Sequence, residues 1–231
     1  NSFGHWERWL RHPEYRHLAE CPFGWAAPNG HGMPWGSTLA PDAQSLEFLG
    51  PLYDAFLPNF SSQRFHVGCD EPWELGTGKS RTRVEEEGRH EIYLDYLLKL
   101  HEAVQRRGRR MLFWADIILE EPDCVSHLPA ELTACVWGYG ADHPFEEETA
   151  RFREHAIPFY VCPGTSSWRS IGGRLRNAGE NIRNAMRSAT ANGASGMLLA
   201  DWGDLGHQQP FAVSLIPLAL AGALAWTGDP D

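Results

Sequence analysis

Short apolar runs alternate with helix-like segments along the whole chain. Each run is closed by Gly, Pro or Asp, which is typical of strands buried on both faces. The predicted strands cover residues 64–69, 110–116, 132–139, 157–164 and 196–202. The segments around them repeat apolar residues at helical spacing, which predicts amphipathic helices. These helices cover residues 45–56, 91–104, 146–155, 177–192 and 211–226.

Strands that alternate with helices predict an α/β fold with a parallel sheet. Five strand–helix units in 231 residues fit either an open doubly wound sheet or most of a barrel. A complete (β/α)8 barrel takes about 250 residues, and segment 1–10 resembles a loop that leaves a strand whose body is absent. We therefore predict one domain over residues 1–231, an incomplete (β/α)8 TIM barrel with approximately strands 4–8 and the loop after strand 3.

The net charge and the hydropathy of the chain argue against two classes of partner, nucleic acids and membranes. The formal net charge is −10, whereas nucleic-acid binders cluster Lys and Arg, so no nucleic acid is expected. Segment 211–226 is strongly apolar but short for a membrane span, and it contains Pro217. A buried terminal helix is the better interpretation, and no membrane is expected. The open edge of an incomplete barrel could pair with another chain, which makes a homo-oligomer one expectation.

The spacing of the cysteines and an incomplete phosphate-loop motif predict no cofactor. The five cysteines are widely spaced and form no C-x-x-C pair. This favours core packing or a reducing compartment such as the cytoplasm over a zinc site or a disulfide framework. "GTGKS" (76–80) lacks the first glycine of a phosphate loop at the required distance. The chain starts at Asn1 without a charged or apolar leader, so no targeting signal is visible and the localisation stays open.

Acidic and aromatic residues recur at the carboxyl ends of the predicted strands, where function collects in a parallel barrel. Aromatic rings stack on the C–H faces of sugars while carboxylates accept bonds from hydroxyls, so a carbohydrate site is predicted. Core packing is the alternative for any single tryptophan. The candidates are Asp70, Glu71, Trp114, Asp116, Trp137, Tyr139, Trp168, Trp202 and Asp204.

Histidines offer weaker candidates. His5, His31 and His207 could bond a sugar, but a structural or exposed histidine is an equal alternative. A metal site built from His66 and Asp70 lacks a further ligand at matching spacing, so no metal is predicted.

The adjacent acids Asp70 and Glu71 are predicted to hold unequal roles. Side chains alternate along a strand, which directs His66 and Asp70 into the barrel. Glu71 would point away if the strand continued, but Pro72 ends the strand and lets the loop turn Glu71 over the site. Two neighbouring acids of this kind cannot easily flank one glycosidic bond as acid and nucleophile.

Several motifs resemble one family of enzymes. "FHVGCDE" (65–71) resembles the H-x-G-x-D-E signature of family 20 glycoside hydrolases, the β-N-acetylhexosaminidases. The other similar segments are "NSFGH" (1–5) to the loop after strand three, "LFWADIIL" (112–119) to strand five, "VWGYG" (136–140) to strand six and "DWGD" (201–204) to strand eight. The likeness covers nearly the whole chain in the family's order.

The resemblance implies a (β/α)8 barrel that hydrolyses terminal non-reducing N-acetyl-β-hexosaminides by a substrate-assisted retaining mechanism. In that mechanism the 2-acetamido oxygen of the substrate attacks the anomeric carbon and forms an oxazolinium ion. Glu71 is then implied as the general acid and Asp70 as the group that holds the acetamido N–H. The implied supporting roles are His66 behind Asp70, Trp114, Trp137 and Trp202 as pocket walls, and Asp204 as an acceptor for distal hydroxyls.

The chain departs from the family pattern in three ways. Cys69 stands where glycine is common. "PGTSSW" (163–168) lacks the tyrosine that bonds the acetamido carbonyl, for which Tyr139, Ser166 or Trp168 are the candidate substitutes. Strands one to three, with the arginine that grips the sugar hydroxyls, are missing from this chain.

Two alternative functions stay open. The first is a conventional retaining glycosidase, with Glu71 as acid and Asp116 or Asp204 as nucleophile. The second is a non-catalytic glycan-binding remnant of such an enzyme, favoured by the missing strands.

Overall fold

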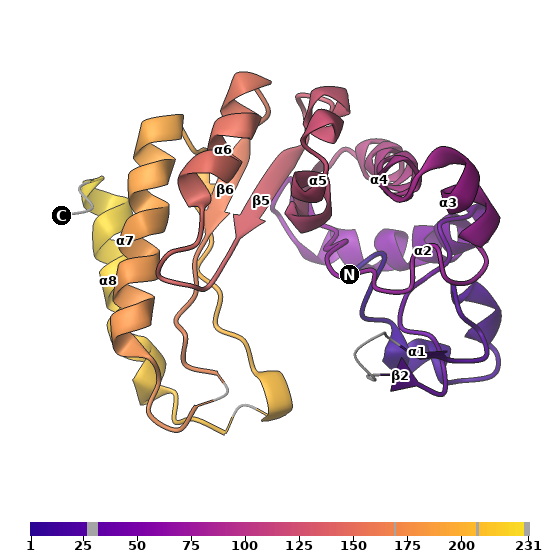
Figure 1. The fold of residues 1–231 in the computed structure, drawn as a ribbon, viewed down its shortest axis with the longest axis horizontal. Coiled ribbons are helices and arrows are strands. Elements are labelled where there is room, and N and C mark those ends of the chain that lie inside the picture. The colour runs from indigo at the N-terminus through magenta and orange to yellow at the C-terminus, as the bar shows by residue number, and fades with distance from the viewer. Residues whose placement is uncertain (27–31, 169, 207, 229–231) are drawn as a thin grey trace. The chain divides into compact units, whose positions relative to one another are not determined.

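The computed structural model describes residues 1–26, 32–168, 170–206 and 208–228 (Figure 1). His31 and His207 lie outside the described residues. The chain divides into two compact units, Asn1–Leu132 and Thr133–Asp231. Each unit combines parallel strands with helices, which confirms the α/β class.

Unit 1 contains a parallel strand pair, β3 and β4, in which Phe65 lies opposite Met111. Helices α2 and α4 pack on one another, and α4 also packs on β4. In chain order the unit comprises α1 (Glu7–Leu10), η1 (Arg16–Leu18), β1 (Trp25–Ala26), β2 (Gly32–Met33), α2 (Ala43–Phe56), η2 (Leu57–Asn59), β3 (Arg64–His66), α3 (Arg81–Glu87), α4 (Arg89–Gln105), β4 (Arg110–Trp114), α5 (Asp116–Glu120) and η3 (Pro122–His127).

The amino-terminal segment belongs to the core of unit 1. Phe3 is buried, and its ring centroid lies 4.7 Å from that of Tyr96 and 5.9 Å from that of Tyr93. The Tyr53 hydroxyl donates to Ser2 Oγ at 2.6 Å, which satisfies a phenol that would otherwise be costly to bury. Since Ser2 N also donates to Val67 O at 2.7 Å, this segment lies directly beside the end of β3.

Unit 2 contains three parallel strands, β5, β6 and β7, in chain order. Helix α6 packs on β5 and β6, α7 packs on β6 and α6, and α8 lies beside α7 (Figure 1). The unit comprises β5 (Thr133–Trp137), α6 (Phe145–Glu154), β6 (Phe159–Cys162), α7 (Leu175–Asn192), β7 (Gly196–Met197), η4 (Asp204–Gly206) and α8 (Ala212–Thr227).

Asparagines on one face of α7 hold the loops that follow the strands of unit 2. Asn181 is fully buried, and its amide donates to Gly138 O at 3.0 Å and to Gly140 O at 2.7 Å. Its side-chain oxygen accepts from Gly164 N at 3.0 Å. The side chain therefore replaces the backbone partners that the loops after β5 and β6 lack.

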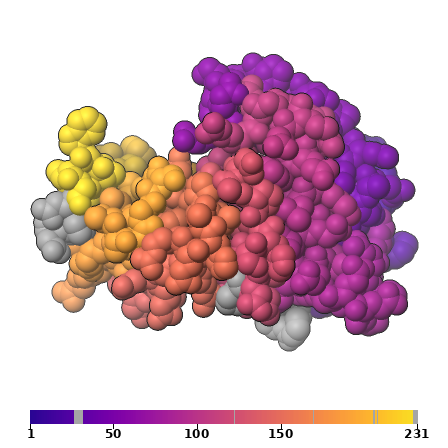
Figure 2. Space-filling model, turned by 90° about the horizontal axis from the view of Figure 1, so that it is seen from above, coloured from indigo at the N-terminus to yellow at the C-terminus, as the bar shows by residue number. Residues whose placement is uncertain are grey.

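Helix α8 forms where sequence predicted it, but the prediction that it is buried is wrong for all but one of its faces. Pro217, Ala221 and Leu224 are buried, whereas Ile216 is 63% and Trp226 is 92% exposed. The yellow carboxyl-terminal part of α8 lies at the surface in Figure 2. Other residues of the chain thus pack against only one face of α8, although α8 is apolar on all its faces. None of the described helices is both long and apolar enough to span a membrane.

The predicted strands are longer than the observed ones, although their positions are correct. β3 ends at His66 instead of residue 69, because Gly68 and Cys69 adopt left-handed backbone conformations with φ of 77° and 73°. Beyond His66 this segment pairs with β4 only through isolated hydrogen bonds, such as the one that Val67 N donates to Leu112 O at 2.9 Å. All five cysteines are unpaired and buried, which confirms the expectation of core packing.

We expect Asn181→Ala to destabilise unit 2 strongly. The substitution leaves one backbone N–H and two carbonyl oxygens without their partner, at a cost on the order of 3 kcal/mol of unfolding free energy. Urea unfolding followed by circular dichroism measures the change. Thr190→Ala, at an exposed position of the same helix, is the matched control and should change the unfolding free energy little. Equal stability of the two variants would contradict the role assigned to Asn181.

Candidate active site at the end of strand β3

The chain turns sharply after β3, and the acid pair lies in this turn. Gly68, Cys69 and Glu71 have φ values of 77°, 73° and 49°. A left-handed conformation is unfavourable for residues with a Cβ atom and costs on the order of 1 kcal/mol or more at each. The turn ends the side-chain alternation before Asp70, so alternation does not govern the direction of either acid.

Hydrogen bonds from distant segments hold the backbone of this turn. The Tyr93 hydroxyl, from α4, donates to Cys69 O at 2.9 Å. Cys69 N donates to Asn1 Oδ1 at 3.1 Å. Glu71 N donates to Asp116 Oδ2 at 3.3 Å, at the start of α5. These partners offset the strain, and they link the turn to three other parts of unit 1.

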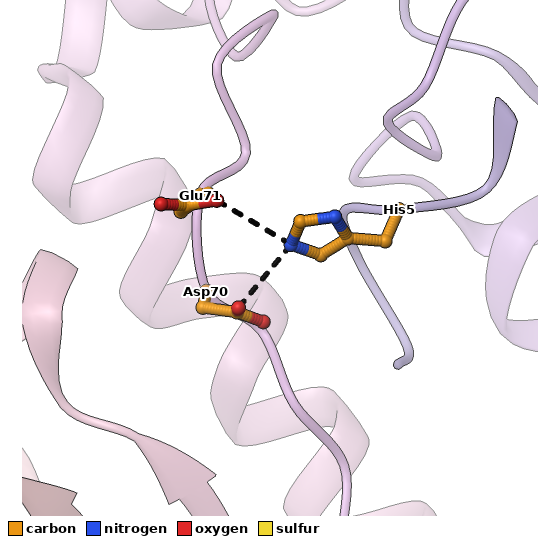
Figure 3. Close-up of side chains that lie close together, drawn as sticks. All are labelled: His5, Asp70 and Glu71. Carbon is orange, nitrogen blue, oxygen red and sulfur yellow. Dashed lines mark hydrogen bonds and ion pairs between the residues drawn. The ribbon is translucent and has the colours of Figure 1, made fainter. Parts of the chain in front are cut away.

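His5 brings the two acids together (Figure 3). Its Nε2 atom lies 3.2 Å from Asp70 Oδ2 and 3.7 Å from Glu71 Oε2. The other Asp70 oxygen, Oδ1, accepts from the amide of Asn1. The side chains of His5, Asp70 and Glu71 are 45%, 16% and 35% exposed, so the cluster is open to solvent on one side.

The approach of the 1–5 loop to the acid pair requires two glycines. A Cβ atom on Gly4 would lie 2.8 Å from Asp70 O, and one on Gly68 would lie 2.5 Å from Asn1 Cγ. Both distances are shorter than any normal contact. Glycine at these two positions therefore allows Asn1 and His5 to reach Asp70.

Charge and hydrogen bonding shift the ionisation of this cluster. The hydrogen bond to Asp70 raises the pKa of His5; burial opposes the shift, and the charges of Asp70, Glu71 and Glu7 add to it. Burial alone would raise the pKa of Asp70, but the bond to His5 and its charge, with a backbone bond and the Asn1 amide, hold that pKa below its usual value. The imidazole therefore favours its protonated form and Asp70 its ionised form.

The other candidates of unit 1 make no hydrogen bond to the acidic side-chain atoms of Asp70 or Glu71 among the described contacts. His66 Nδ1 accepts from Gly68 N at 3.0 Å, and its ring lies 4.3 Å from that of Trp114. Among the described contacts none joins His66 to Asp70, the partner that the sequence resemblance implied. Asp116 binds the backbone of Glu71, which makes it a positioning group for the turn.

The remaining aromatic candidates form one cluster in unit 2. The Tyr139 ring stacks on Trp137 at 5.3 Å between centroids and meets the edge of Trp168 at 4.9 Å. Trp202 Nε1 donates to the Tyr139 hydroxyl at 2.7 Å. Trp168 is buried, while Trp202 is 39% exposed. The structure thus joins four sequence-predicted residues, Trp137 at the end of β5 and three from the segments that follow β5, β6 and β7.

Two acids near Trp202 have different environments. Asp204 is exposed in η4. Asp201, which sequence analysis did not single out, accepts at Oδ1 from Thr165 Oγ1 at 2.6 Å, Ser167 Oγ at 2.5 Å and Ser214 Oγ at 3.1 Å. These hydroxyls fix the backbone that leads into Trp202.

Sequence analysis also missed the α7 asparagines that support Tyr139. Asn177 donates to Tyr139 O at 2.6 Å and to Ser166 Oγ at 2.8 Å. Asn177, Asn181 and Asn184 are spaced by four and three residues, which places them on one helix face. That spacing was a signal that could have revealed them.

Comparisons with known proteins identify one family of enzymes. Residues 5–163 match the model of glycosyl hydrolase family 20, catalytic domain. Hexosaminidase D of Homo sapiens is 28% identical over 150 residues, which are 61% of this chain and 29% of the human protein. Hexosaminidase D of Bos taurus is 31% identical over 153 residues, which are 61% of this chain and 40% of the bovine protein.

Solved structures share the fold. A chitobiase from Flavobacterium johnsoniae has a TM-score of 0.63 at 14% identity and matches 98% of this chain and 37% of its own. A β-N-acetylhexosaminidase from Bacteroides fragilis has a TM-score of 0.63 at 17% identity and matches 93% of this chain and 46% of its own. The chain thus spans less than half the length of these four proteins.

The raised pKa of His5 predicts a pH-dependent stability. Its protonation stabilises the folded state fully below the ordinary pKa of 6.5, and this contribution is lost as pH rises through the folded-state value. We expect the unfolding free energy of the wild type to fall across that range, and His5→Gln to remove this part of the fall. Urea unfolding at a series of pH values, with NMR titration of the His5 ring, measures both quantities.

His155→Gln, which replaces an exposed histidine after α6, is the matched control and should retain the wild-type profile. Identical profiles for wild type and His5→Gln would contradict the ion pair between His5 and Asp70.

Proposed function

Because the chain belongs to glycosyl hydrolase family 20, we propose that it acts in the hydrolysis of terminal non-reducing N-acetyl-β-hexosaminides. The observation that carries the proposal is the convergence of Asp70 and Glu71 on His5 at the end of β3. The names of the related proteins, hexosaminidase D and chitobiase, support the substrate class. In this proposal β3 to β7 are strands four to eight of a barrel.

Glu71 is the proposed general acid. Its carboxyl group is 35% exposed, so the leaving oxygen of a substrate can reach it. On its other side it lies close to the His5 imidazole. It protonates the glycosidic oxygen as the bond breaks and then accepts a proton from the attacking water.

Asp70 is the proposed acceptor for the acetamido N–H of the substrate. Its lowered pKa keeps it ionised at neutral pH, and the two oxygens are oriented by Asn1 and His5. An anion at this position holds the acetamido group against the anomeric carbon and stabilises the positive charge of the oxazolinium intermediate.

The geometry of the acid pair argues against Asp70 and Glu71 themselves acting as the acid and the nucleophile of a two-carboxylate reaction. His5 Nε2 and one oxygen each of Asp70 and Glu71 all lie within 4.8 Å of one another. A conventional acid and nucleophile flank the glycosidic bond from two sides with their carboxyl groups about 5–5.5 Å apart. Two carboxylates that face the same imidazole are better suited to different parts of one substrate.

The aromatic cluster of unit 2 is proposed, by itself, as a surface that binds the apolar face of a sugar. Trp137, Tyr139 and Trp202 present stacked and hydrogen-bonded rings on which the apolar faces of a sugar can rest. Tyr139 is the proposed substitute for the tyrosine that segment 163–168 lacks, since it is the only hydroxyl among the described rings of this cluster. The exposed Asp204 remains the proposed acceptor for distal hydroxyls.

We expect Glu71→Gln to reduce hydrolysis in a leaving-group-dependent manner. With chitobiose, whose sugar leaving group needs protonation, kcat should fall about 10²- to 10⁴-fold. With a 4-nitrophenyl glycoside the step that breaks the glycosidic bond should be slowed much less, because nitrophenolate leaves without a proton. The later attack of water, for which Glu71 is the base, should be slowed equally with both substrates. Steady-state kinetics on both substrates measure the difference.

Glu47→Gln, at an exposed site on α2, is the matched control and should leave both rates unchanged. A kcat for chitobiose within about tenfold of the wild-type value would exclude Glu71 as the proton donor. Binding of N-acetylglucosamine by the wild type without any turnover would instead support the glycan-binding remnant. Covalent labelling of Asp116 or Asp204 by a 2-fluoro sugar would support the conventional glycosidase.

Tyr139→Phe should weaken substrate binding while it preserves the stacked ring. The variant removes the acceptor of the Trp202 indole, so KM should rise about fivefold, the equivalent of roughly 1 kcal/mol for one hydrogen bond. Tyr160→Phe in β6 is the matched control, and both variants are compared by steady-state kinetics. An unchanged KM in Tyr139→Phe would remove Tyr139 from the proposed surface.

A further inference from the structure

We propose that His5, Asp70 and Glu71 also form a binding site for a divalent transition metal, for which Zn²⁺ is the probe, and that the metal blocks the acid pair when it binds. The binding part of this inference stands on the geometry of the cluster alone. The inhibition part rests on the proposed function.

The donor set suits zinc. The cluster offers one imidazole nitrogen and two carboxylate oxygens, which are both ligand types that Zn²⁺ accepts. Two ionised carboxylates would neutralise the charge of the metal. Ca²⁺ and Mg²⁺ are expected to bind poorly, because they prefer a larger set of oxygen ligands.

Two of the three distances between ligand atoms are close to those of a tetrahedral site. Zinc bonds to nitrogen and oxygen of about 2.0–2.1 Å place neighbouring ligand atoms about 3.3–3.4 Å apart. His5 Nε2 lies 3.2 Å from Asp70 Oδ2 and 3.7 Å from Glu71 Oε2. The three ligand atoms all lie within 4.8 Å of one another, so a small rotation of the Glu71 side chain completes one face of the tetrahedron.

The surroundings orient the ligands in advance. The Asn1 amide donates to Asp70 Oδ1, which leaves Oδ2 directed at His5. Asn1 Oδ1 in turn accepts from Phe3 N at 3.0 Å and Cys69 N at 3.1 Å, so the Asn1 side chain is itself fixed. Such outer contacts hold a ligand in the geometry that binding requires.

A metal can reach the site from solvent. The other histidine–carboxylate pairs of the described residues have no third ligand. His5 and Glu71 are 45% and 35% exposed, which leaves an entry path and room for water as a fourth ligand. His143 with Glu148, at 2.8 Å, and His90 with Glu120, at 3.2 Å, each provide one carboxylate. The His5 cluster is the one group of three such ligands among the described residues.

Zinc at this position should act as a reversible inhibitor and not as a cofactor. It would occupy an oxygen of Glu71, the proposed proton donor, and an oxygen of Asp70, the proposed acceptor for the acetamido N–H. Metal and substrate would therefore exclude one another.

The test is calorimetric titration of the chain with ZnCl₂, with His5→Gln and Glu71→Gln as site variants. The expected result is one zinc ion per chain, with an affinity reduced about tenfold or more in both variants. When Co²⁺ replaces Zn²⁺, we expect the absorption spectrum of tetrahedral cobalt without a thiolate-to-cobalt band. His90→Gln is the matched control, because it removes a histidine with a single carboxylate neighbour and should keep the wild-type affinity. Circular dichroism verifies that each variant is folded.

Unchanged zinc affinity in folded Glu71→Gln and His5→Gln would overturn the site. Cobalt spectra with a thiolate band would also overturn it, because the ion would then be held by cysteine. If the chain hydrolyses its substrate, zinc should raise the apparent KM and a chelator should restore it; full activity with zinc bound would overturn the inhibition. Zinc binding that depends on His5 in a chain without hydrolase activity would refute the proposed function and support the metal site.

Discussion

The site of unit 1 depends on the left-handed turn that follows β3. Cys69 and Glu71 adopt backbone conformations that L-residues avoid. They are held there by the Tyr93 hydroxyl, the Asn1 side chain and Asp116, which bind the backbone on both sides of Asp70. Cys69 stands where sequence comparison with the family suggested glycine, and its φ of 73° gives the physical reason for that preference. The strain places two carboxylates beside one imidazole, an arrangement that an extended strand would not allow.

The same arrangement underlies the chemistry that we propose. One imidazole faces two carboxylates and favours the charged form of Asp70, whose pKa it lowers. In the proposed function a proton in this cluster serves glycoside hydrolysis, whereas a metal ion in the same place would compete with it. Both proposals thus use the same distances from His5 Nε2 to Asp70 and Glu71, although different measurements test them.

Local sequence patterns predicted the helices and strands well, because each depends on periodicity within a few residues. Helices α4 and α7 occur within two residues of the predicted bounds. The roles of Asn1, Asn181 and Asp201 could not be predicted in the same way. Each acts through partners that are distant in sequence, such as Asp70 for Asn1 and Gly138 for Asn181. Only folding reveals which backbone groups need a side-chain partner.

The sequence by itself determined the α/β class, the positions of the parallel strands and the presence of an Asp-Glu pair at a strand end. Apolar periodicity and the motif "FHVGCDE" suffice for these, since they are local properties of the chain. The tertiary structure alone decided that β3 ends at His66, that His5 joins the two acids, and that Tyr139 gathers three tryptophans. Those features depend on backbone strain and on contacts across tens of residues, which no local pattern records.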